Sequence, residues 1–107
     1  MERISDSLLR EAATRLGETA RKPARVILFG SYANGAADPS SDVDFLVIQR
    51  DGFSHRQEII RFQDTLGPLR IPAELLVISQ TEAAAPERAG DAVRDALRAG
   101  VVLYESA

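Results

Sequence analysis

The fold of this chain is decided by the stretch VILFGS at residues 26–31. Its first four residues form a short, continuous apolar run, which is typical of a strand covered on both faces. Gly30 ends this predicted strand, and residues 32–35 form the first turn of a short helix directly after Ser31. A strand that turns at once into a helix directs backbone N–H groups and a hydroxyl toward one point, where an anion can bind. Gly30 and Ser31 are therefore candidate phosphate ligands.

Asp42 follows Ser31 after ten intervening residues and precedes a second predicted strand, which runs from Val43 to Ile48. This run is rich in β-branched and aromatic residues, and the loop before it is rich in turn formers. Side chains two positions apart on a strand share a face, so the carboxylates of Asp42 and Asp44 lie side by side while Val43 points into the core. Adjacent carboxylates repel each other, and Mg²⁺ prefers such oxygen ligands together with phosphate oxygens. The pair is a candidate Mg²⁺ site.

Glu74 is the third candidate acid, because it is the only charged residue in the apolar run at residues 71–78. Burying a lone carboxylate costs free energy. The cost is offset if this run forms the next strand and brings Glu74 beside Asp42 and Asp44. There Glu74 would complete a metal site or accept the proton of an attacking hydroxyl. The alternative is a Glu on an edge strand that points to solvent.

The remaining elements follow from periodicity and capping signals. Apolar residues recur every four positions from Ile4 to Ala20, which predicts an amphipathic helix capped by Ser5 or Asp6. The patterns Ser-x-x-Gln and Ser-x-x-Glu, at Ser54 and Ser79, are typical of capping boxes. The expected order is helix (4–20), strand (26–29), strand (43–48), helix (54–66), strand (71–78), helix (87–98) and strand (101–104). This order predicts an α/β fold with a small mixed sheet flanked by helices.

Composition narrows the class of protein. A chain of 107 residues with 45% hydrophobic content forms one compact domain and leaves no room for a second substrate-binding domain. The net charge of −3 and the absence of a basic block argue against binding to duplex nucleic acid. The absence of cysteine excludes disulfides and thiolate zinc sites, so carboxylates must hold any metal. No apolar run is long enough to cross a bilayer, and we expect a soluble, cytoplasmic protein.

The combined pattern of Gly30-Ser31, ten residues, Asp42-x-Asp44 and a later strand carboxylate resembles the minimal nucleotidyltransferases of the DNA polymerase β-like superfamily. The resemblance spans nearly the whole chain and includes the closing segment at residues 99–105. It implies the polymerase β-like nucleotidyltransferase fold and a single minimal nucleotidyltransferase domain over residues 1–107. It also implies that Gly30 and Ser31 bind the phosphates of an NTP and that Asp42 and Asp44 bind Mg²⁺. Glu74 stands where the family usually has Asp, and a misplacement on the ångström scale can cost about a hundredfold in rate.

The resemblance also narrows the role. Several minimal members resemble the antitoxin (MNT) half of a two-protein module, whose other half is an all-helical HEPN-type ribonuclease toxin. It implies transfer of AMP from ATP to a tyrosine hydroxyl of that toxin. Two alternatives remain: an inactive antitoxin that neutralises by binding alone, and a transferase for a small molecule such as an aminoglycoside. A domain this small has little surface to enclose an acceptor, which favours a partner protein.

Overall fold

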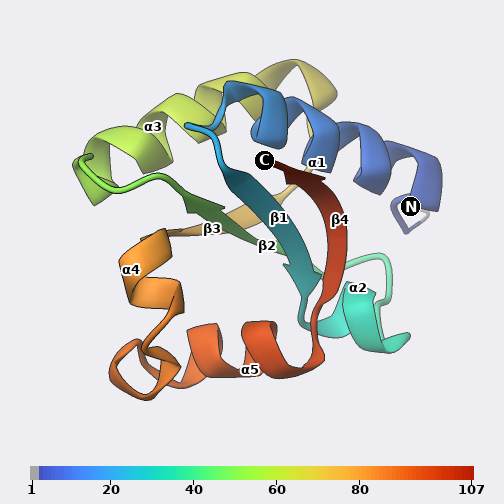
Figure 1. Cartoon of the computed structure of the whole chain (residues 1–107). Coiled ribbons are helices and arrows are strands. Elements are labelled where there is room, and N and C mark those ends of the chain that lie inside the picture. Colours follow the sequence, from blue (N-terminus) through green and yellow to red (C-terminus); the bar gives the residue numbers. More distant parts are fainter. Residues whose placement is uncertain (1–2) are drawn as a thin grey trace.

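A four-stranded mixed sheet separates two helical layers in the computed structural model, which describes residues 3–107 (Figure 1). The strand order is β3-β2-β1-β4, in which β1 is antiparallel to β2 and β4 while β2 is parallel to β3. The strands are β1 (Ala24–Phe29), β2 (Val43–Gln49), β3 (Ala73–Ser79) and β4 (Val101–Ser106). The predicted α/β class, with a small mixed sheet between helices, is confirmed.

The helices divide between the two faces of the sheet, as Figure 1 shows. The long helices α1 and α3 cover one face, and α5 covers the other. The helices are α1 (Asp6–Thr19), α2 (Ser31–Asn34), α3 (His55–Leu66), α4 (Gln80–Ala83) and α5 (Asp91–Ala99), with 3-10 turns at Gly67–Leu69 and Pro86–Arg88. The longest helix in this described part of the chain, α1, has 14 residues, and none of the helices there could cross a bilayer.

Two apolar cores hold the layers together, because the central strands are buried on both faces. Val26 and Leu28 of β1 belong to the core under α1 and α3, whereas Ile27 between them belongs to the core under α5. All three are at most 5% exposed, as a strand covered on both faces requires. The same alternation continues in β2, where Phe45 and Leu46 face opposite cores and are fully buried. The continuous apolar runs therefore place β1 and β2 at the centre of the sheet.

Capping side chains set the starts of three helices at the predicted residues. The Ser5 hydroxyl accepts a hydrogen bond from the Leu8 amide at 3.2 Å, so α1 begins at Asp6. Ser54 caps α3 in the same way. Ser79 and Glu82 form a complete capping box, in which the Ser79 amide donates to Glu82 Oε1 at 2.9 Å and the Ser79 hydroxyl accepts from the Glu82 amide at 3.0 Å.

Several predicted boundaries differ from the structure by one or more residues, and two of the differences have a clear physical cause. The last helix was expected from residue 87, but α5 begins at Asp91, because residues 86–88 form a 3-10 turn and Gly90 follows with φ of 91°. A positive φ is incompatible with an α-helix and is adopted most readily by glycine. The third strand was expected from residue 71 and begins instead at Ala73, since Pro72 has no N–H to donate to the ladder.

A buried acid at the carboxyl end of β2 forms a network that the sequence pattern does not reveal. Glu58 of α3 is 4% exposed and accepts hydrogen bonds from Gln49 at 2.8 Å and from the Arg61 guanidinium at 2.6 and 2.9 Å. Arg61 also donates to the backbone carbonyl of Thr19 at 2.7 Å, at the end of α1. The hydrogen bonds from Arg61 outweigh burial and lower the pKa of Glu58 to about 2. The network thus ties α1, β2 and α3 together.

We predict that Glu58→Ala lowers the free energy of unfolding by about 3 kcal/mol, because it leaves Gln49 and Arg61 without their shared partner. The folded-state pKa lies below the unfolded value of 4.5, so this contribution is complete above pH 4.5 and is lost as the pH falls toward 2. Urea unfolding between pH 2 and 7 measures both effects. Glu18→Ala, at an exposed position of α1, is the matched control and should change stability little.

Candidate functional site

The register of the sheet brings the predicted site residues to one end of three neighbouring strands. β1 ends where the antiparallel β2 begins, and Phe29 is the cross-strand partner of Asp44. On the other side β3 runs parallel to β2, and Glu74 is the cross-strand partner of Asp44. Gly30 and Ser31 follow directly after β1. Asp44 therefore lies between the turn after β1 and the acid on β3.

The carboxyl groups of Asp44 and Glu74 are in contact. Asp44 is half-buried, and burial, a hydrogen bond with Glu74 and the charges of Glu74 and Asp42 raise its pKa from 3.8 to about 6. A hydrogen bond between two carboxyl groups requires a proton between them. The predicted position of Glu74 beside Asp44 is confirmed. Its expected burial is wrong, because β3 is an edge strand of the sheet and leaves Glu74 exposed.

Asp42 lies one residue before β2 and is exposed, while Val43 is fully buried in the core under α1 and α3. This alternation agrees with the predicted sharing of a face by Asp42 and Asp44. The loop before Asp42 is organised by Asp38, whose Oδ1 accepts from the Ser40 amide at 2.8 Å and from the Ser40 hydroxyl at 2.7 Å. These hydrogen bonds lower the pKa of Asp38. Asp38 thus stabilises the turn that directly precedes Asp42.

Position 30 requires glycine, because the backbone there lies against the carboxylate of Asp44. Its φ is 74°, which side chains with a Cβ rarely adopt, and a Cβ at this position would collide with Oδ2 of Asp44. Its carbonyl accepts hydrogen bonds from the Ala33 amide at 3.1 Å and the Asn34 amide at 3.2 Å. Ser31 is the first residue of α2, one position earlier than the predicted helix, and is half-buried. The turn backbone therefore lies against the carboxylate.

The donor set suits a hard divalent cation. Asp42, Asp44 and Glu74 supply only oxygen atoms, and a cation would offset both the burial and the neighbouring negative charges that raise the pKa of Asp44. Within residues 3–107 no three His, Cys, Asp or Glu side chains form a ready cluster around an ion. Mg²⁺ does not need one, because it binds through one or two carboxylates with water and phosphate oxygens. The residues therefore fit Mg²⁺ bound together with a phosphate ligand.

Two hollows flank this end of the sheet and share Phe29 and Ala92 as walls. The hollow on the turn side has a volume of about 330 Å³, and Gly30 lines it. The hollow on the acid side has a volume of about 360 Å³, and Asp44 and Glu74 line it. The neighbouring helix α2 adds Asn34 to the turn side. Helices farther along the chain complete both hollows, with Asp95 and Ala99 of α5 on the turn side and Gln63 of α3 on the acid side.

Phe29, Gln63 and Ala92 escaped the sequence analysis as site residues. Phe29 belongs to an apolar strand, Gln63 is an exposed polar residue of a helix and Ala92 belongs to a stripe of small residues on another helix. Each of these contexts is ordinary, and no motif singles the residue out. Their place in the site depends on how α3 and α5 pack against the sheet.

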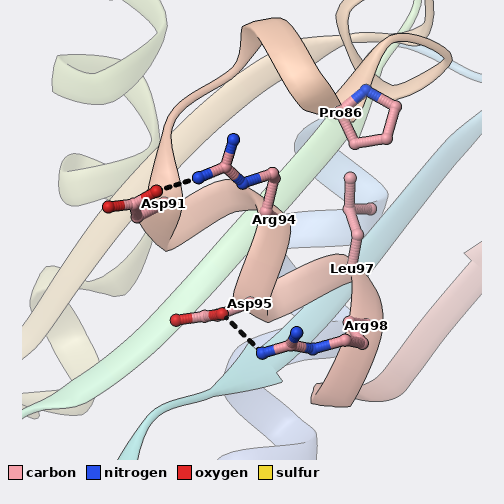
Figure 2. Close-up of a pocket in the computed structure, with 6 residues that line it drawn as sticks. All are labelled: Pro86, Asp91, Arg94, Asp95, Leu97 and Arg98. Atoms are coloured by element: carbon pink, nitrogen blue, oxygen red, sulfur yellow. Dashed lines mark hydrogen bonds and ion pairs between the residues drawn. The ribbon is translucent and has the colours of Figure 1, made fainter.

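A larger hollow of about 590 Å³ lies on the outer side of α5 (Figure 2). Figure 2 shows its polar side chains paired with one another, Arg94 with Asp91 and Arg98 with Asp95, the latter at 2.9 Å. Neither the acids on β2 and β3 nor the turn after β1 line it. Its charges are thus satisfied within the helix, and it is not the candidate site.

Comparison with known proteins finds a domain family that matches most of the chain, including this end of the sheet. The sequence model of the nucleotidyltransferase domain matches residues 8–101, which include the turn after β1 and all three site acids. No curated protein sequence matches the chain. The match covers β1, β2 and β3 completely and ends at the first residue of β4.

Solved structures share the fold at low sequence identity. A candidate nucleotidyltransferase from Sulfolobus solfataricus is 19% identical with a TM-score of 0.60, over 92% of this chain and 78% of that one. A toxin–antitoxin complex with AMP-PNP contains a chain that is 18% identical with a TM-score of 0.64, over 91% of this chain and 73% of that one. A complex of the tri-AMPylated Shewanella oneidensis HEPN toxin with an MNT antitoxin contains a chain that is 17% identical with a TM-score of 0.60. That match covers 95% of this chain and 74% of the other. The predicted nucleotidyltransferase fold is confirmed.

We predict that Asp44→Asn stabilises the metal-free protein at pH 7.5 by about 1 to 2 kcal/mol, a value reduced for the partial exposure of the side chain. The folded-state pKa of about 6 exceeds the unfolded value of 3.8, so ionising Asp44 destabilises the fold as the pH rises through 6. Thermal unfolding in EDTA at pH 4 and pH 7.5 measures the difference, which should vanish at pH 4. Asp42→Asn, at an exposed position, should change stability less, and a destabilised Asp44→Asn at pH 7.5 would contradict the repulsion.

Proposed function

This chain belongs to the nucleotidyltransferase domain family, and we propose that it transfers AMP from ATP to a hydroxyl group of a partner protein. The proposed acceptor is a tyrosine, and the proposed partner is a HEPN-type toxin. The observation that carries the proposal is the position of Asp44, in contact with Glu74 on one side and against the Gly30 backbone on the other. A phosphate held by the turn and a hydroxyl beside Glu74 would meet at this carboxylate.

Each site residue has a proposed role in the transfer. Gly30 allows the turn to approach the triphosphate closely, and the Ser31 hydroxyl donates to one of its oxygens. Asp42, Asp44 and Glu74 are the proposed ligands of Mg²⁺, which when bound neutralises charge on the phosphates. Glu74, which is exposed on the edge strand β3, is also the proposed acceptor of the hydroxyl proton. These roles need the three carboxylates ionised, which burial and mutual repulsion oppose at Asp44 below pH 6.

The choice of partner rests on the structural neighbours. Two of them are toxin–antitoxin complexes, one with AMP-PNP and one with an AMPylated HEPN toxin and an MNT antitoxin. At 17–18% identity they share only the fold with this chain, so a HEPN partner is a proposal.

A second candidate function is neutralisation by binding alone. It is favoured by one observation: Glu74 lies on the edge strand β3 and is exposed, whereas the sequence led us to expect a buried metal ligand there. Glu74 also extends the acid on β3 by one methylene relative to the Asp usual in the family. An inactive relative would keep the fold and the partner surface while losing the transfer.

We predict that the wild-type protein moves radiolabel from [α-³²P]ATP to a co-expressed HEPN-type partner in the presence of Mg²⁺. Asp42→Asn and Asp44→Asn should lower the rate by about a hundredfold or more, because each removes a proposed metal ligand. Asp64→Asn, which removes an exposed acid of α3, is the matched control and should retain activity. Phosphorimaging of the separated proteins measures the transfer.

The same variants separate the two candidate functions. If the toxin is neutralised by Asp44→Asn as well as by wild type, and wild type transfers no label, the protein acts by binding alone. Loss of neutralisation together with loss of label supports the transfer. Calorimetric titration with ATP, with and without Mg²⁺, tests the nucleotide site separately from the partner.

A further inference from the structure

The two hollows at the site lie on opposite sides of Asp44. In the order of the sheet, Glu74 on β3 comes first, Asp44 on β2 second and the turn after β1 third. The hollow of about 360 Å³ opens beside Glu74, and the hollow of about 330 Å³ opens beside Gly30. Asp44 lines the hollow on the Glu74 side, and Gly30, which lies against its carboxylate, lines the other, so the site can be approached from two sides.

In-line displacement gives these two approaches different roles. The acceptor oxygen forms its bond to the α-phosphorus as the bond from that phosphorus to the bridging oxygen of the β-phosphate breaks. The electron pair leaves with pyrophosphate, and the hydroxyl proton passes to a carboxylate. The attacking and leaving oxygens lie on opposite sides of the phosphorus. With the phosphates on the Gly30 side, the acceptor must approach from the side of Glu74.

We propose that Gln63 determines the specificity for the acceptor, as a contact in the hollow on the Glu74 side, the acceptor subsite, where the aromatic ring of the acceptor tyrosine would lie. This inference rests on the proposed transfer. The volume of about 360 Å³ lies in the range of small-ligand sites, about 300 to 1,000 Å³. The walls are apolar at Phe29, Ala73 and Leu76, and the acids Asp44 and Glu74 are the charged groups among the lining residues. A phenol matches this division, with its ring on the walls and its hydroxyl at the acids.

Gln63 extends to the strand end from α3. Its Nε2 donates to the Ala73 carbonyl at 3.3 Å, a long hydrogen bond that links α3 to the first residue of β3. The side chain is exposed and lines the hollow with Glu74. An amide that is exposed and weakly held can exchange this bond for one with an incoming acceptor. Gln63 is thus a contact for the acceptor outside the proposed phosphate and metal ligands.

The acceptor subsite lies at an edge of the sheet. β3 is the terminal strand on this side, so the strand that carries Glu74 has a neighbour only at β2. A segment of a partner protein can reach such an edge without displacing a helix. An acceptor side chain presented by another protein can therefore enter beside Glu74.

Two tryptophan variants at exposed positions test the assignment, each in the full chain. Gln63→Trp fills the hollow on the Glu74 side, and Ala99→Trp fills the hollow on the Gly30 side. Gln63→Trp should raise the KM for the HEPN-type partner at least tenfold and leave the Kd of ATP with Mg²⁺ within twofold. Ala99→Trp should weaken ATP binding and leave the KM for the partner within twofold. Calorimetry measures the Kd, and label transfer measures the KM.

A binding measurement without turnover gives an independent readout. Saturation-transfer NMR with N-acetyl-L-tyrosinamide, in the presence of AMP-PNP and Mg²⁺, should detect contact of its ring with the wild-type protein. Gln63→Trp should abolish that signal, and Ala99→Trp should preserve it at saturating AMP-PNP. Gln63→Arg, which suits an exposed helix position, replaces the tryptophan variant if thermal unfolding shows that the latter is destabilised.

The outcomes distinguish the two levels of the proposal. Wild-type protein that neither binds ATP with Mg²⁺ nor transfers label defeats the proposed function and the subsite with it. Wild-type protein that transfers label while Gln63→Trp keeps the wild-type KM and NMR signal overturns the acceptor subsite alone. The same holds if Ala99→Trp, rather than Gln63→Trp, raises the KM for the partner.

Discussion

The contact between the carboxyl groups of Asp44 and Glu74 is the interaction on which the rest of the site depends. It exists because β2 and β3 pair in a register that places the two residues opposite each other. The contact is unfavourable when both groups are ionised, and together with burial, which is the larger cause, it raises the pKa of Asp44 to about 6. Below pH 6 a proton on Asp44 relieves the repulsion in the free protein. A cation bound with a phosphate ligand would relieve it in the working state that we propose.

The buried strands explain how the fold tolerates this repulsion. Val43 and Phe45, on either side of Asp44, are fully buried in the core under α1 and α3. A slip of one residue would turn these side chains to the other face of the sheet and the acid into the core, so the register is strongly specified. At the opposite end of β2, Gln49 bonds to Glu58, whose pKa is lowered to about 2 by Arg61. One end of the strand is thus a stabilised ion network, and the other holds like charges together.

The helices decide what surrounds these charges. α5 contributes Ala92 to both hollows, and its small side chain leaves space on each side of Phe29. α3 contributes Gln63 to the acid side, and the single turn of α2 contributes Asn34 to the other side. The large hollow on the outside of α5 has its charges paired in place. The candidate chemistry is therefore concentrated at the strand ends that line the two smaller hollows.

Much of the fold could be predicted because its signals are local. Capping by Ser5, Ser54 and Ser79 depends on residues three positions apart, and the strand runs depend on neighbours along the chain. The boundary at Asp91 was wrong because the conformation of Gly90 had no signal distinct from that of other glycines. The spacing from Gly30 to Asp44 indicated one site, since a strand, a tight turn and a neighbouring strand leave few ways to arrange these residues.

By itself the sequence determined which strands and longer helices form, that the strand ending at Phe29 is buried on both faces, and that the turn at Gly30 and the acids on β2 share one end of the sheet. These features follow from periodicity, capping and short connections, all of which act between residues close in the chain. Only the tertiary structure decided that β3 is an edge strand and leaves Glu74 exposed, that Glu58 is buried, and that Gln63 and Ala92 line the site. These features depend on strand order and helix packing, which bring together residues far apart in the chain and leave no periodic trace in its sequence.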